Sequence, residues 1–151
     1  MGYEPLYLEY LVYFNRDRDY FECHEVLEEL WLAKDKDPVY KGLLQIAVGL
    51  FHFRNNNVRG GRMMLESAVF RLERETTREL GIDLVKLVLE VKDYAARLEQ
   101  FEHQPFAYYD LTIDIIDSVL ADEVSRVSDN LQPNIPQRRK PQRPSKTKNR
   151  H

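Results

Sequence analysis

Cysteine and long apolar runs are scarce in this sequence, and each scarcity excludes a class of protein. A single cysteine, Cys23, excludes an intrachain disulfide, so we expect a reducing and therefore cytoplasmic setting. The N-terminus has neither the basic start nor the apolar stretch of a secretory signal. The most apolar segment is only twelve residues long and cannot span a bilayer, so we expect no membrane association. At 151 residues, the chain is long enough to bury one sizeable core.

The twelve-residue segment runs from Gly42 to Phe53, and within it only Gln45 and His52 carry polar side chains. A helix that is apolar on every side must be surrounded by other elements, so this segment is predicted to be the central helix of a small bundle. At about 100° per residue, Gln45 and His52 fall within about 20° of each other on one face. Because buried polar groups need partners, this face is expected to meet another polar group.

Apolar periodicity predicts helices along most of the chain, connected by short turns. The last predicted helix has the least regular pattern, because Leu111, Ile113 and Ile115 alternate as in a strand, whereas later apolar residues repeat as in a helix. The fold class is therefore predicted to be all-α, a small antiparallel helical bundle of five to six helices with a disordered basic C-terminal tail. The predicted helices cover approximately residues 5–15, 19–34, 38–54, 60–75, 83–98 and 112–128.

Charge divides the chain into an acidic body and a basic end. Residues 132–151 hold seven Lys or Arg residues and no acid, whereas the rest holds 15 basic and 25 acidic residues, a formal net charge of about −10. We predict a helical-bundle domain over 1–104, an additional helical segment over 105–131 and a disordered basic tail over 132–151. The tail has no aromatic residue for base stacking, so nucleic acid binding is expected only through its charge.

The second predicted helix carries the polar residues best spaced to form a site. On a helical wheel, Glu22, Glu25 and Glu29 fall on one face, which we predict to be exposed to solvent. His24 lies in the middle of the opposite, apolar arc, and Glu28, four residues later, lies toward its edge. These two side chains are therefore the predicted partners of the polar groups on the central helix.

Two imidazoles and a carboxylate that converge from adjacent helices form a candidate ligand set for a divalent transition metal. In this interpretation His24, Glu28 and His52 bind the metal, while Gln45 and Trp31 shape a ligand-binding pocket. Two histidines and one carboxylate leave coordination positions open for water, so a hydrolytic reaction is one hypothesis. The sequence assigns no catalytic residue, no substrate and no particular metal.

The spacing His24-x3-Glu28-x2-Trp31, followed by His52 on the next predicted helix, resembles the bacterial, archaeal and plastid-lineage proteins grouped as domain of unknown function DUF309. The resemblance covers roughly residues 7–75, about half of the chain. It implies an all-α fold without implying an established activity. It also implies a shared polar site formed by His24, Glu28, Trp31, Gln45 and His52.

A second interpretation gives the same residues a structural role. Here His24, Glu28, Gln45 and His52 form a closed hydrogen-bond network that joins two core helices and fixes their register. The protein would then be a non-catalytic helical interaction module that binds a protein partner or a second copy of itself. A third interpretation is a small-ligand or catalytic site at the same residues without a metal, and all three stay open at the level of the sequence.

Overall fold

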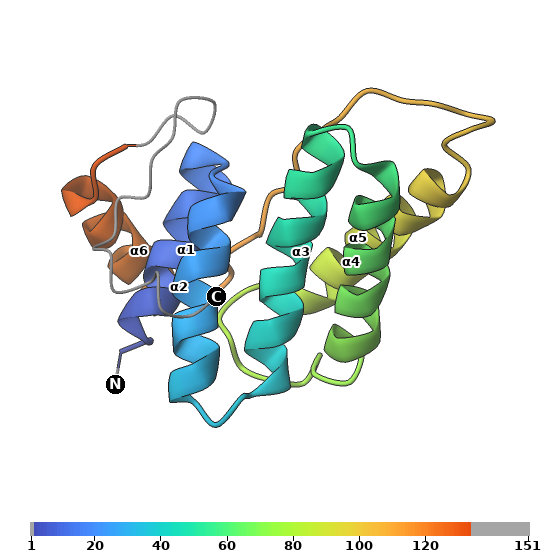
Figure 1. Ribbon diagram of the computed structural model, residues 1–151. Helices are drawn as coiled ribbons and strands as arrows, with labels where there is room; N and C mark the ends of the chain where they lie inside the picture. The colour runs from blue at the N-terminus through green and yellow to red at the C-terminus, as the bar shows by residue number, and fades with distance from the viewer. Residues whose placement is uncertain (1, 134–151) are drawn as a thin grey trace.

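The computed structural model describes residues 2–133, and in that range the chain forms six α-helices and one π-helical turn, with no strand (Figure 1). This confirms the predicted all-α class. Most of the predicted disordered tail, residues 134–151, lies outside the described residues. The elements in order are α1 (Pro5–Val12), η1 (Tyr13–Asp17), α2 (Tyr20–Ala33), α3 (Pro38–Arg54), α4 (Val58–Leu72), α5 (Leu84–Glu99) and α6 (Ser118–Asn130).

Short polar side chains set the starts of five helices. Each capping side chain accepts a hydrogen bond from a backbone N–H in the first turn, which satisfies one of the free donors at a helix start. The prediction of α3 over 38–54 is confirmed at both ends. The fourth helix begins a few residues earlier than predicted, because the polar run after α3 also supplies the cap of α4. The five caps are Asp19, Asp37, Asn57, Asp83 and Asp117.

The first helix changes its winding before it ends. It was predicted to end near Asn15, but α1 ends at Val12 and continues as the π-helical turn η1 to Asp17. Arg18 then adopts a left-handed backbone conformation, with φ of 55°, which stops the helix before α2. The tight reversal places α1 antiparallel beside α2, so that the aromatic side chains of α1 enter the core.

Helix α3 lies at the centre of the bundle, as its apolar composition predicts. It packs against both α2 and α4, while α5 packs on α4 and α1 packs on α2 (Figure 1). Helix α6 packs on α1 at the opposite edge from α5. Every α-helix contributes to one cluster of buried apolar residues. Within the described residues, no helix is both long and apolar enough to cross a bilayer.

The segment between α5 and α6 crosses the molecule from one edge to the other (Figure 1). A helix from Thr112 was predicted, and this is wrong, because α6 begins only at Ser118. Leu111 and Ile113 are instead buried in an extended stretch. Ile115 forms an isolated antiparallel bridge with Ile82, whereas the backbone of Ile113 bonds to a side chain. Asn15 donates to the Ile113 carbonyl and accepts from its N–H, both at 2.9 Å.

Candidate metal site

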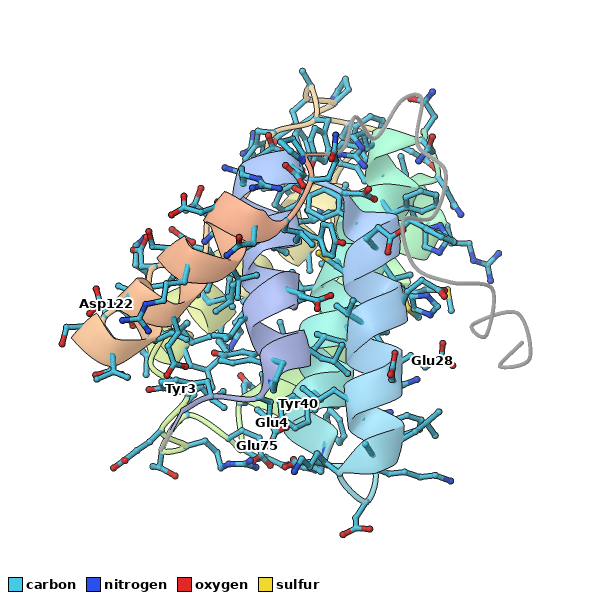
Figure 2. All side chains as sticks on the ribbon, turned by 90° about the vertical axis from the view of Figure 1, so that its left-hand side faces the viewer. Tyr3, Glu4, Glu28, Tyr40, Glu75 and Asp122 are labelled. Carbon is cyan, nitrogen blue, oxygen red and sulfur yellow. The ribbon has the colours of Figure 1, made fainter. Side chains whose placement is uncertain are left out.

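One face of α2 brings an imidazole and two carboxylates together. His24 Nε2 lies 3.8 Å from Glu28 Oε1, and His24 Nδ1 lies 3.4 Å from Glu25 Oε2. One ligand atom from each of the three residues lies within 4.8 Å of the other two. No other group of three His, Cys, Asp or Glu residues in the described range meets this criterion. Figure 2 shows Glu28 projecting outward from α2, on the side away from α1.

The burial of these side chains differs from the wheel-based expectation. The Glu25 side chain is only 4% exposed, whereas His24 and Glu28 are 32% and 23% exposed. Glu22 is also buried, so the prediction of an exposed glutamate face is wrong for Glu22 and Glu25, and Glu29 is half-buried. A helical wheel contains only the periodicity of one helix and cannot show what other parts of the chain lie over each face.

A pocket of about 210 Å³ opens beside this group, between α2 and α3. His24 belongs both to the group and to the pocket wall, so the two features adjoin at this side chain. His52 of α3 also lines the pocket, which places the two predicted histidines around one space. His52 lies outside the compact group, however, and the predicted triad is therefore brought together only in part. The lining residues are Tyr20, Phe21, His24, Val48, Phe51 and His52.

His52 is held at the turn between α3 and α4. Its Nδ1 lies 3.4 Å from Nδ2 of Asn57, the residue that caps α4. Its ring meets the ring of Phe51 edge-on, with centroids 6.0 Å apart. These contacts fix the His52 ring on the α3 side of the pocket, opposite α2.

Gln45 faces α4 rather than the histidines. It is buried, and its Oε1 accepts a hydrogen bond of 3.1 Å from Nε of Arg71. Gln45 does not line the pocket, and His52 bonds to Asn57. The single closed network of the structural interpretation is therefore not formed among the described residues.

Trp31 lies two helical turns along α2 from His24. Its ring is half-buried and is covered by the ammonium groups of Lys41 and Lys36, which lie 4.7 and 5.8 Å from its centroid. Such cation–π contacts contribute about 0.5–1 kcal/mol at partly exposed sites. Trp31 does not line the pocket, so its predicted role in ligand binding stays a prediction.

Two neighbouring groups in the core are kept in their neutral forms by burial. Cys23 is fully buried and donates to the Tyr10 carbonyl at 3.7 Å, and burial raises the pKa of its thiol well above the usual value. Burial likewise raises the pKa of Tyr20, whose hydroxyl donates to Asp110 at 3.0 Å. Neither group therefore supplies a nucleophile or a charge to the pocket near neutral pH.

Comparisons with known proteins place these residues in a family. The model for the domain of unknown function DUF309 matches residues 7–64. An uncharacterized protein of Bacillus subtilis, YpuF, is 32% identical over 130 residues, which covers 83% of this chain and 72% of YpuF. The chain belongs to the DUF309 family.

The region matched by the DUF309 model contains every residue predicted for the site, from His24 to His52. A second relative of this DUF309 protein, an uncharacterized protein of Aquifex aeolicus, is 30% identical over 69 residues. That match covers 44% of this chain and 21% of the Aquifex protein. No solved structure matches the chain significantly.

Sequence reasoning missed Glu25 and the aromatic wall of the pocket. Glu25 was assigned to the solvent because of its wheel position, although it directly follows His24 and can reach that ring. Phe21 and Phe51 are apolar residues of ordinary helices, and only the packing of α2 on α3 turns them into a pocket wall. The signal that could have identified Glu25 was its adjacency to His24.

Proposed function

We propose that this DUF309 protein binds a divalent transition metal through His24, Glu25 and Glu28. The observation that carries the proposal is the compact group of three ligand atoms, each within 4.8 Å of the others. Imidazole and carboxylate are common ligands of zinc, iron, nickel and manganese, so one histidine and two glutamates form a suitable set. The partial exposure of His24 and Glu28 gives an ion access from solvent.

This ligand set revises the one expected from the sequence. His24 and Glu28 are retained, and Glu25 is added because it lies closer to His24 than Glu28 does. His52 remains a candidate further ligand because it lines the pocket that His24 shares. Its Nδ1 faces Asn57, so Nε2 is the ring nitrogen that would bind the ion. Trp31 and Gln45 stay proposed contacts for a ligand that extends along α2 and α3.

Three protein ligands leave coordination positions for water, and a bound divalent metal lowers the pKa of such a water. Metal-assisted hydrolysis is therefore the reaction class to screen first. The alternative, a non-catalytic interaction module, depended on a closed network of His24, Glu28, Gln45 and His52. Gln45 bonds to Arg71 and His52 to Asn57, and this weakens that alternative.

The test is the metal content of the full chain, purified without a tag or chelator and measured by elemental mass spectrometry. Near-stoichiometric metal is expected in the wild type, directly or after incubation with Zn, Mn, Fe or Ni salts. His24→Ala should lose it, and Glu28→Gln should bind at least tenfold more weakly, because each removes one ligand. His103→Ala is the matched control, since His103 is an exposed histidine far along the chain from α2.

Circular dichroism of each variant checks that the helices are retained. The proposal is overturned if the wild type binds none of these metals. Equal metal content in the wild type and His24→Ala would also overturn it.

A further inference from the structure

We infer that the pocket between α2 and α3 binds one aromatic ring of a small aryl carboxylate, whose carboxylate is held by the metal at His24, Glu25 and Glu28. The position of the carboxylate rests on the proposed metal site, whereas the ring site stands on the pocket alone. The pocket and the group share His24, so the ring site and the head-group site adjoin at this side chain.

The size of the pocket fits one ring. Its volume is about 210 Å³, and an apolar cavity of about 150 Å³ is enough to hold benzene. The remaining space accommodates a short link between the ring and its head group. A fused, two-ring system with its own substituents would protrude into solvent.

The lining of the pocket is chemically suited to an aromatic ring. The Tyr20 hydroxyl donates to Asp110, so the histidine rings are the other polar side chains among the lining residues. Phe21, Phe51 and Val48 complete an apolar wall. Aromatic rings in such surroundings gain from edge-to-face and offset contacts at about 4.5–7 Å as well as from burial.

The charge around His24 should affect the binding of the carboxylate head group but not the binding of the aromatic ring. Glu25 and Glu28 flank His24 and repel a carboxylate when no metal is bound. A divalent ion reverses the sign of the local charge and supplies a direct ligand position. The affinity for an aryl carboxylate should therefore depend on the metal, while the affinity for a neutral aromatic alcohol should not.

The experiment compares benzoate, acetate and benzyl alcohol as probes, each titrated into metal-free and zinc-loaded full-length protein. Binding is followed by NMR shifts of the Val48 methyl groups and the His52 ring. Benzyl alcohol should shift both sets of resonances with similar affinity in the two forms. Benzoate should bind the zinc-loaded form at least tenfold more tightly than the metal-free form. Acetate, which lacks the ring, should bind the zinc-loaded form at least tenfold more weakly than benzoate.

A pocket-filling variant provides the second measurement. Val48→Phe should weaken both aromatic probes at least tenfold, whereas Val85→Phe, at a residue of α5 that is 54% exposed, should leave them unchanged. The NMR shifts of Val48 and His52 in the wild type test the ring site even if Val48→Phe does not fold. The inference is overturned if benzyl alcohol at millimolar concentration shifts neither Val48 nor His52. Equal zinc-dependent binding of benzoate and acetate would overturn it as well.

Failure of the metal site gives a different result. If no metal binds but benzyl alcohol still occupies the pocket, the proposed function and the carboxylate position fail together while the ring site stands. If metal binds and no aromatic probe enters the pocket, the ring site fails while the proposed function stands.

Discussion

Asp37 links two parts of the chain through one side chain. Its Oδ1 accepts the Val39 N–H at 3.1 Å as the cap of α3, and its carboxylate also accepts from both terminal nitrogens of Arg78, at 3.1 and 2.8 Å. The Arg78 guanidinium holds the pKa of Asp37 below its usual range. A carboxylate whose pKa is lower in the folded state than in the unfolded state stabilises the fold only while it is ionised.

This pKa shift predicts an acid-dependent loss of stability. The contribution of Asp37 is complete above the unfolded-state pKa of about 4 and is lost as the pH falls through the lower folded-state value. Asp37→Asn retains a capping oxygen but loses the charge, so it should lower the free energy of unfolding at pH 7 by about 1 kcal/mol or less. The difference between wild type and variant should shrink toward zero below pH 4.

Urea denaturation at pH 7, 4 and 3 measures this difference. Asp122→Asn, at an exposed residue of α6 (Figure 2), serves as the control and should give no comparable difference. A difference for Asp37→Asn that stays constant from pH 7 to pH 3 would contradict the prediction.

Single residues also show where prediction from the sequence stops. The pairing of His24 with Glu28 was predictable because their i, i+4 spacing within one helix fixes their distance. The pairing of Gln45 with Arg71 was not, because it depends on the register between α3 and α4. The burial of Glu25 was not predictable either, since it depends on what lies over α2.

At the scale of elements, α3 and α4 approach closely where α3 carries a glycine. A Cβ added to Gly49 would lie 2.7 Å from Cδ2 and 2.8 Å from Cγ of Leu65, and 3.2 Å from the carbonyl oxygen of Gly61. Leu65 is fully buried, so it has no space into which to withdraw. The two backbones can therefore pack at this distance only because Gly49 has no side chain.

Gly49→Ala is expected to destabilise the protein although alanine favours the helix. The gain in helix propensity is about 1 kcal/mol, whereas overpacking a fully buried contact typically costs about 1–3 kcal/mol. We expect a net loss in the free energy of unfolding, measured by urea denaturation. Ser67→Ala, on the partly exposed side of α4, should be neutral or slightly stabilising. Stabilisation by Gly49→Ala would show that α3 and α4 can move apart at little cost.

Helix starts were easier to predict than the path between helices. Asp37 with Pro38, and Asp83, mark the starts of α3 and α5 by their own chemistry. The start of α6 was misplaced because the apolar residues from Leu111 satisfy helical and strand-like patterns equally well. Their extended form depends on partners distant in sequence, such as Asn15, and no local pattern contains that information.

At the scale of the whole molecule, hydrogen bonds join the N-terminal part of the chain to α6 and its cap. Tyr3 donates its hydroxyl to Asp117 at 2.7 Å, and its N–H to Glu123 at 2.9 Å. Arg16 of η1 donates to the carbonyl of Ser128 in α6 at 2.7 Å. Leu111, Ile113 and Leu120 belong to the same buried cluster as the residues of α1 to α5. We therefore expect the described part of the chain to unfold as one cooperative unit.

Ile113 and Ile116 allow a direct test of this cooperativity, because they are the same residue three positions apart with opposite burial. Ile113 is 1% exposed and Ile116 is 69% exposed. Ile113→Ala should lower the free energy of unfolding by about 2–5 kcal/mol, whereas Ile116→Ala should change it little. The fluorescence of Trp31, the only tryptophan and a residue of α2, should report the full loss for Ile113→Ala. If the segment after α5 unfolds separately, the Trp31 transition will stay at its wild-type midpoint while amide exchange over 112–130 accelerates.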